Sequence, residues 1–305
     1  MTPPRPASGI SSKGYTVKII EKIKQRSPFY SLEFFPPKER ENWPAFFTTL
    51  EALRALDPLF VSVTYGAGGG TQAYTLEIAS RMAAMGITPM SHLTCVGATA
   101  ESIQDYLDKL RAAGVKNILA LRGDVPKGQT VRWEECPFSY ASDLVRFVRR
   151  YAPEMGIGVA AYPTPHPESA SFAEDREAAV FKLGQGSDFA VTQLFFDYRE
   201  YFEYVERMQA LGVAKPIIPG VLPVPSFATL RRVLALSGCN IPAKLYLALE
   251  EADRTGGPEA VKEAGIAFAV SQIRRLLDGG APGVHLYTLN QAETCLRIAQ
   301  EVGPL

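Results

Sequence analysis

Residues 117–124 read NILALRGD, an uninterrupted apolar run followed by two opposite charges around a glycine. A short apolar run of this kind is typical of a strand buried on both faces of a parallel sheet. The apolar spacing before it predicts a helix over Ala100–Ala113, which Gly114 closes, and the spacing after it predicts a helix over Ala141–Tyr151. This helix–strand–helix order indicates one unit of an α/β fold.

The same alternation continues in both directions along the chain. We expect eight strands, at Phe29–Phe34, Phe60–Thr64, Thr88–Leu93, Asn117–Leu121, Ile157–Tyr162, Phe189–Leu194, Pro216–Val221 and Gly283–Tyr287. The other helices are expected at Asn42–Leu56, Thr71–Met85, Phe172–Gly184, Tyr198–Leu211, Ser226–Leu236 and Gln291–Val302, with a helical insertion, Lys244–Leu277, before the last strand. Eight βα units favour a closed (β/α)8 TIM barrel over an open doubly wound sheet, which the same alternation also allows.

Composition excludes several classes of protein. The 305 residues include 32 basic and 32 acidic side chains, so the net charge is zero, which argues against a dedicated binder of nucleic acid or of anionic membranes. No apolar stretch approaches the roughly 18 residues of a membrane-spanning helix. The four cysteines form no CxxC pair and the three histidines no HExxH motif, so we expect no metal site or disulfide framework. The sequence predicts a cytoplasmic protein with a loose tail at residues 1–14 and one catalytic barrel at 15–305.

Polar residues follow nearly every expected strand. In a TIM barrel the carboxyl ends of the strands share one rim, where active sites of this fold lie. The polar residues at these ends are Glu33, Thr64, Tyr65, His92, Thr94, Arg122, Asp124, Tyr162, His166, Gln193, Tyr287 and Asn290. Such a convergent set is what a binding or catalytic site requires.

Glu33 is the most distinctive of these residues, because it stands in SLEFFPP among large apolar side chains and prolines. Burial there is expected to raise the pKa of its carboxyl group, which would suit it to act as a general acid near neutral pH. The alternative is a structural ion pair, for instance with Arg122.

Other charged groups near the rim have two interpretations each. Arg122 can fork onto a phosphate and Asp124 can bond a ring nitrogen, or the two can form a local ion pair. His166 lies between two prolines in a stiff loop, which favours a contact with a ligand. Asp175 and Lys182 are seven residues apart on one expected helix and so share a face, which is either solvated or part of the site.

Eight segments of the chain together resemble a known family. SLEFFPPK, FVSVTYGAGG, SHLTCVGAT, NILALRGD, AAYPTPHPES, VTQLFFD, IIPGVLP and HLYTLN are similar, in this order, to the signature blocks of methylenetetrahydrofolate reductases. The resemblance runs from about Phe29 to Val302, with one block at each expected strand. Because the chain ends where the catalytic barrel of that family ends, it resembles the bacterial, barrel-only form.

The resemblance implies a flavoenzyme of one-carbon metabolism and methionine biosynthesis, with FAD bound non-covalently across the rim. NADH or NADPH would deliver hydride to the flavin and leave, and 5,10-methylenetetrahydrofolate would then accept the hydride to give 5-methyltetrahydrofolate. Glu33 matches the acid of the family, which protonates the folate so that its five-membered ring opens to an iminium. Asp124 matches the aspartate that lies near the flavin and the pterin.

The resemblance also assigns binding roles by position. The residues that match FAD contacts are Thr64, Tyr65, Ala67, His92, Arg122, Gly123, Asp124, Tyr140, Ala141, Tyr162, His166, Asp175 and Lys182. Gln193 and Tyr287 match residues on the substrate side. The departures are Ala178, Phe181, Thr229 and Gln291, which stand where enterobacterial-type members carry Asn, Arg, Gln and Arg. They put some contacts with FAD and with the glutamate tail of folate in doubt.

Two other functions are compatible with these residues. The same barrel and folate chemistry could draw electrons from a ferredoxin or an iron–sulfur partner subunit, and a cluster would then lie on that partner because the chain has no cluster-binding cysteine pattern. The chain could instead be a flavin- or folate-binding protein whose activity has lapsed. A homo-oligomer is compatible with either.

Overall fold

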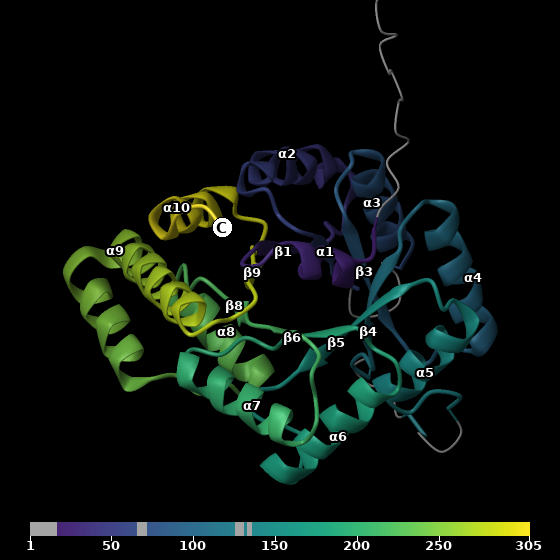
Figure 1. The fold of residues 1–305 in the computed structure, drawn as a ribbon. Helices are drawn as coiled ribbons and strands as arrows, with labels where there is room; N and C mark the ends of the chain where they lie inside the picture. Colours follow the sequence, from purple (N-terminus) through teal and green to yellow (C-terminus); the bar gives the residue numbers. More distant parts are fainter. Residues whose placement is uncertain (1–16, 66–71, 126–130, 133–135) are drawn as a thin grey trace, which may run out of the picture.

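The computed structural model describes residues 17–65, 72–125, 131–132 and 136–305 (Figure 1). The expected tail at residues 1–14 and one expected FAD contact, Ala67, lie outside the described residues.

Parallel strands form a single sheet at the centre of the molecule. They are β1 (Tyr30–Phe34), β2 (Val61–Val63), β3 (Pro89–Thr94), β4 (Asn117–Leu121), β5 (Gly156–Ala161), β6 (Phe189–Thr192), β7 (Ile217–Ile218), β8 (Gly220–Val221) and β9 (Val284–Tyr287). Their order in the sheet is β7-β6-β5-β4-β3-β2-β1-β9-β8. Every neighbouring pair is parallel, as the alternation with helices predicts.

The sheet closes through one short segment, residues 217–221. Its first part, β7, pairs with β6, whereas its second part, β8, pairs with β9. Pro219 separates the two because proline has no N–H to donate, although its carbonyl oxygen accepts a hydrogen bond from His285 N at 2.9 Å. The seventh expected strand is thus split in two, and the prediction of a (β/α)8 barrel is confirmed.

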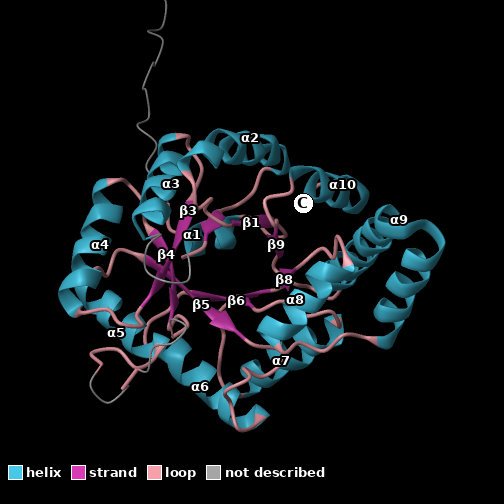
Figure 2. Ribbon diagram, turned by 180° about the vertical axis from the view of Figure 1, so that it is seen from behind, coloured by secondary structure: helices cyan, strands magenta, loops and turns pink. Residues whose placement is uncertain are grey.

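Helices surround the strands in both views (Figure 2). They are α1 (Ile19–Gln25), α2 (Trp43–Leu53), α3 (Gln72–Ala84), α4 (Ala100–Ala112), α5 (Ala141–Tyr151), α6 (Phe172–Gly184), α7 (Tyr198–Ala210), α8 (Phe227–Ser237), α9 (Ala243–Asp278) and α10 (Ala292–Val302). Short 3-10 turns flank α2 at Arg40–Asn42 and Arg54–Leu56. The expected insertion is α9, which Gly257 breaks with φ 65° and ψ −155° immediately before Pro258.

Helix α1 differs from the others because it closes the amino-terminal end of the barrel rather than its outer wall (Figure 2). Ile19 and Ile23 are buried against the apolar side chains of the barrel interior. The Asn117 side chain accepts a hydrogen bond from Ile19 N at 2.8 Å and donates one to Val17 O at 3.2 Å. The sequence pattern predicts no element here, because so short a helix is stable mainly through such docking.

The apolar core has two main layers. The larger lies between the strands and the helices, and the smaller fills the lower part of the barrel with residues such as Phe29, Phe60, Met90, Leu119 and Phe189. Buried polar side chains such as Glu33 and His92 lie toward the carboxyl ends of the strands, which is where a site can form. Within the described ranges, no helix is long and apolar enough to cross a membrane.

Candidate active site

Glu33 lies at the centre of a buried polar group inside the barrel. Strand pairing places Glu33 opposite Ser62, and Ser31 opposite His285. Three atoms surround one carboxylate oxygen, Glu33 Oε2: Ser62 Oγ and His92 Nε2 at 3.3 Å each, and His285 Nε2 at 3.4 Å. We call Glu33, Ser31, Ser62, His92 and His285 the acid cluster. Its members are all less than a tenth exposed, so their interactions are weakly screened by water.

The expected rise in the pKa of Glu33 is wrong. Burial does raise this pKa and is the largest single influence, but the hydrogen bond with His285 and the nearby His92 and His285 imidazoles together outweigh it. The pKa of Glu33 is lowered to about 2. The neighbours of Glu33 in the chain are apolar and indicate burial alone, whereas the two imidazoles come from β3 and β9.

A turn after β9 fixes the main chain around Glu33. Thr288 Oγ1 donates to Glu33 O at 2.6 Å, and Asn290 Nδ2 donates to Phe35 O at 2.8 Å. Leu289 and Asn290 adopt left-handed φ values of 49° and 57°. Such values are unusual outside glycine, and here they turn the Asn290 side chain onto the end of β1. The TLN sequence after the last strand therefore serves to hold the carboxylate in place.

Tyr287 also stands on this rim, directly beside the acid cluster. Its hydroxyl donates to Thr192 O at 2.7 Å, and its ring lies edge-on to His285 with centroids 5.6 Å apart. A Cβ atom at Gly220 would lie 2.7 Å from Tyr287 Cε2, so the ring occupies the space that this glycine leaves free. Gln193 follows β6 nearby, and its Oε1 accepts a hydrogen bond from Leu194 N at 3.0 Å.

A second polar group lies on the outer side of the rim. Arg122 forms a bidentate ion pair with Glu168, with N–O distances of 2.7 and 2.8 Å. This excludes the ion pair with Glu33 that the sequence left open. We call the following residues, which come from β4, the loop after β5 and α6, the cofactor rim: Arg122, Tyr162, His166, Glu168, Asp175 and Lys182.

The rest of the cofactor rim is built around two aromatic rings and one amine. The Tyr162 and His166 rings meet edge to face with centroids 5.1 Å apart. Lys182 Nζ lies 5.6 Å from the centroid of the Tyr162 ring and donates to Ala160 O at 2.6 Å. Burial lowers the pKa of Lys182 to about 8, although the charge of Asp175 opposes this shift. As predicted, Asp175 and Lys182 face the same side of α6.

The remaining expected FAD contacts follow the carboxyl ends of β2 and β4 or the start of α5. Gly123 has φ +85°, a value that favours glycine, and a Cβ there would meet Val96 and Thr94 side chains at 2.8 and 2.9 Å. Asp124 is exposed beside it. Thr64, Tyr65, Tyr140 and Ala141 complete this set.

The four positions where the resemblance implies other residues lie on α6, at the start of α8 and just before α10. Ala178 and Phe181 are exposed on α6 one and two turns from Asp175, and Phe181 is 56 % exposed. Thr229 N donates to Ser226 Oγ at 3.2 Å, and this hydrogen bond caps α8. Gln291 precedes α10, and its Oε1 accepts a hydrogen bond from Thr294 Oγ1 at 3.4 Å.

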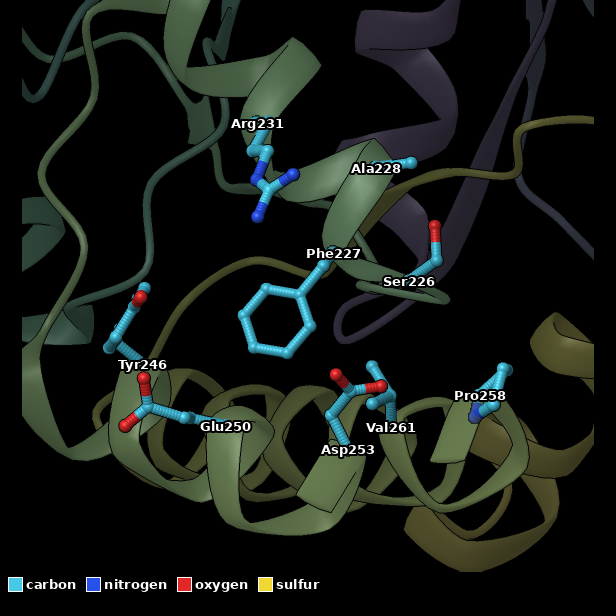
Figure 3. Close-up of a pocket in the computed structure, with 9 residues that line it drawn as sticks. All are labelled: Ser226, Phe227, Ala228, Arg231, Tyr246, Glu250, Asp253, Pro258 and Val261. Carbon is cyan, nitrogen blue, oxygen red and sulfur yellow. The ribbon is translucent and has the colours of Figure 1, made fainter. Parts of the chain in front are cut away.

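A cavity of about 430 Å³ lies between α8 and α9 (Figure 3). The Phe227 ring points into it from α8, with Arg231 on the same side and Glu250 and Asp253 facing them from α9. It contains none of the site residues that the sequence predicted. Among the described residues, no group of three or more His, Cys, Asp or Glu side chains could hold a metal ion.

Known proteins that resemble this chain identify its family. The family model for methylenetetrahydrofolate reductase matches residues 18–303. The chain belongs to this family. A reductase from Salmonella typhimurium described as 5,10-methylenetetrahydrofolate reductase is 34% identical over 274 residues, which cover 90% of each chain. Methylenetetrahydrofolate reductase (NADH) 1 of Arabidopsis thaliana is 36% identical over 303 residues, but the chain spans only 51% of its length.

A solved structure supports the fold alone. It is an uncharacterized protein from Clostridium thermocellum, whose description says that it binds two copies of 5-methyl-5,6,7,8-tetrahydrofolic acid. The TM-score is 0.64 at 15% sequence identity, and the match covers 93% of this chain and 97% of that one.

Three members of the acid cluster, Ser31, Ser62 and His285, were missed by the sequence analysis. Each lies on the same face of its strand as the residue two positions away, so Ser31 aligns with Glu33 and His285 with Tyr287. This alternation was a usable signal for which side chains point inward. It does not say which strands are neighbours, and β9 pairs with β1 only because the barrel closes.

Proposed function

We propose that this protein reduces 5,10-methylenetetrahydrofolate to 5-methyltetrahydrofolate, with hydride from NADH or NADPH and with FAD as the resident cofactor. The observation that carries the proposal is the acid cluster. It places one buried carboxylate at the rim of a barrel whose family performs this reduction, with its second oxygen left for a ligand.

The geometry of Glu33 suits proton delivery. All contacts of its carboxylate among the described residues converge on Oε2, and 9% of the side chain stays exposed. Oε1 is therefore the oxygen that a folate nitrogen can approach. A proton placed on the nitrogen that leaves the bridging carbon opens the five-membered ring to an iminium, and hydride addition to that carbon completes the methyl group.

The cofactor rim fits the chemistry of FAD. Arg122 and Lys182 are cations suited to phosphate oxygens, and Tyr162 and His166 offer flat rings beside them. The bound flavin would supply the hydride-carrying step between nicotinamide and folate. The backbone at Gly123 and the Asp124 side chain would lie toward its ring system, while Gln193 and Tyr287 would hold the substrate.

Lys182 and Arg122, the two cations of the cofactor rim, differ in how readily each could bind a phosphate group. Lys182 is held by a main-chain carbonyl oxygen and needs no change of partner to meet a phosphate. Arg122 is already paired with the Glu168 carboxylate, which a phosphate group would have to displace. Ala178 and Phe181 add no polar atom on this side of α6. The rim therefore supports FAD binding through fewer charged contacts than the family pattern has.

The test is an anaerobic stopped-flow experiment on the purified protein with FAD. NADH, NADPH and reduced ferredoxin are compared as donors by the loss of flavin absorbance, and folate is then added. We expect a nicotinamide to bleach the flavin and methylenetetrahydrofolate to restore its colour. Reduction by ferredoxin alone would favour the iron–sulfur alternative, and protein that neither binds FAD nor gains activity from it would contradict the proposal.

The Glu33→Gln variant tests the acid within the same experiment. We expect flavin bleaching by the nicotinamide at the wild-type rate, but a loss of roughly 100- to 10,000-fold in the folate step, because the positioned proton is gone. The matched control is Glu51→Gln, which changes an exposed glutamate paired with Arg54 on the protein surface. Equal folate rates in both variants would remove Glu33 from the acid role.

A further inference from the structure

His285 is a buried titratable group that the proposed chemistry leaves without a role. It is 0% exposed, on β9. Its ring stacks on Phe60, with centroids 5.5 Å apart and planes 19° apart, and meets the Tyr287 ring edge-on. The ring is therefore held on two sides, and both of its nitrogens must find partners inside the barrel.

Each nitrogen has such a partner. Nδ1 lies 2.9 Å from Ser31 Oγ, and Nε2 lies 3.4 Å from Glu33 Oε2. Ser31 Oγ is also within 3.3 Å of Val284 O, to which its hydroxyl can donate. When the Ser31 hydroxyl donates to Val284, it is free to accept from Nδ1, and a protonated ring then donates at both nitrogens. The imidazolium form of His285 thus satisfies every one of these contacts at once.

The neighbouring carboxylate favours the same form. Glu33 is a buried carboxylate, and a buried charge needs an opposite charge and hydrogen bonds to be stable. His92 Nε2 is at a similar distance from Oε2, but among the described residues this atom has no well-aligned hydrogen-bond partner. The titratable groups that face the Glu33–His285 pair are His92 on β3 and Tyr287 on β9. His285 is the better placed of the two imidazoles.

We propose that His285 is the positioning residue of the acid: it holds the Glu33 carboxyl group in place and stores the proton that Glu33 delivers. This inference rests on the proposed function. The proton moves from Nε2 to Oε2, which leaves a neutral imidazole and a carboxylic acid. A half-turn of the carboxyl group presents the protonated oxygen to the folate nitrogen, which takes the proton.

The exchange of oxygens leaves the cluster intact, because the two oxygens are chemically equivalent and the incoming one takes over the contacts with Ser62, His92 and His285. Glu33 is ionised again after the transfer, and a proton from solvent restores the imidazolium. His285 itself has no exposed surface, so it reaches the substrate only through Glu33.

The first experiment reads the charge of His285 directly. The chain has only three histidines, so labelling with ¹⁵N-histidine gives few imidazole signals, which a His285→Gln variant assigns. We expect His285 to be an imidazolium at pH 7 in the wild-type protein and a neutral ring in Glu33→Gln. The His166 signal serves as an internal reference. A neutral His285 in the wild type that does not respond to Glu33→Gln would overturn the proposal.

The second experiment is kinetic and uses His285→Gln in the FAD-loaded protein. A glutamine amide can still donate to Glu33 but cannot store a proton. We expect flavin bleaching by the nicotinamide at the wild-type rate, a folate step slower by about 100-fold, and loss of the wild-type pH dependence of that step. Should this variant fail to fold, Ser31→Ala removes only the Nδ1 partner and is expected to shift the pH profile alone.

The two proposals fail in different ways. If Glu33→Gln leaves the folate step intact, the acid role and the proposed function are contradicted. If Glu33→Gln stops the folate step while His285→Gln and Ser31→Ala keep the wild-type rate and pH profile, only the role of His285 is wrong.

Discussion

The acid cluster and the cofactor rim are built from the same barrel by different means. The acid cluster lies inside, its members come from β1, β2, β3 and β9, and strand register places Glu33 opposite Ser62 and Ser31 opposite His285. The cofactor rim lies on loops and on α6, where Arg122 pairs with the more exposed Glu168. Residues whose partners are held by register leave little room for change, whereas exposed helix positions can vary. Ala178 and Phe181, where the resemblance implies other residues, are exposed helix positions of this second kind.

The largest effect that separates the two regions is the pH dependence of stability. The folded pKa of Glu33 is about 2, below its ordinary value of 4.5, so its ionised form stabilises the fold above pH 4.5 and this contribution is lost as pH falls toward 2. It amounts to on the order of 3 kcal/mol in the free energy of unfolding. Urea unfolding at pH 6, 4 and 3 should show that the free energy of unfolding of the wild type exceeds that of Glu33→Gln at pH 6 and that this difference shrinks as the pH falls.

The control for this titration is Glu51→Gln on the surface, whose stability should follow that of the wild type across the same pH values. Parallel curves for the wild type and Glu33→Gln would mean that the imidazoles do not hold the carboxylate ionised. The ion pairs of the acid cluster would then contribute as little to the free energy of unfolding as the exposed ion pair of the cofactor rim.

The next effect concerns the packing beside the acid cluster. In Gly220→Ala, the new Cβ would lie 2.5 Å from Thr192 O and 2.7 Å from Tyr287 Cε2, so the Tyr287 ring must move. We expect a loss of about 1–3 kcal/mol in the free energy of unfolding, measured by urea denaturation. Gly184→Ala is the matched control, because a Cβ there meets nothing within 4 Å. Equal stability of the two variants would show that the ring adjusts freely.

On the cofactor rim, Lys182→Met should weaken FAD binding by about 10-fold, since one cation facing the phosphates is lost. Burial lowers the pKa of Lys182 to about 8, so the amine loses its charge as pH rises through that value. FAD affinity of the wild type, measured by fluorescence, should therefore fall between pH 7 and 9, while that of Lys182→Met stays level. Lys109→Met changes an exposed lysine of α4 and should retain the wild-type profile.

The smallest effect is expected for Glu168→Gln. Removing this carboxylate takes away the group that competes with a phosphate for the Arg122 guanidinium, and because the pair is partly exposed, we expect FAD to bind only a few-fold more tightly. Glu203→Gln provides the control, since Glu203 pairs with Arg176 on α6. Weaker FAD binding in Glu168→Gln would show instead that the ion pair orients Arg122 for the cofactor.

Local sequence patterns predicted the elements well. The strand Asn117–Leu121 and the helices Ala141–Tyr151 and Phe172–Gly184 have the expected bounds, because apolar spacing and capping residues act within a few positions. The short helix α1 was missed since its stability comes from Asn117 and the barrel interior, far away in the chain.

The sequence by itself determined the alternation of strands and helices, the parallel sheet and the set of polar residues at the strand ends. Those features follow from periodicity and from the connection rule for parallel strands. Only the tertiary structure decided the partners. The pairing of β9 with β1 brings His285 close to Glu33, His92 reaches it from β3, and together the two imidazoles reverse the direction of its pKa shift. The apolar neighbours of Glu33 in the chain are enough to predict its burial, whereas the two imidazoles that oppose the effect of burial come from other strands.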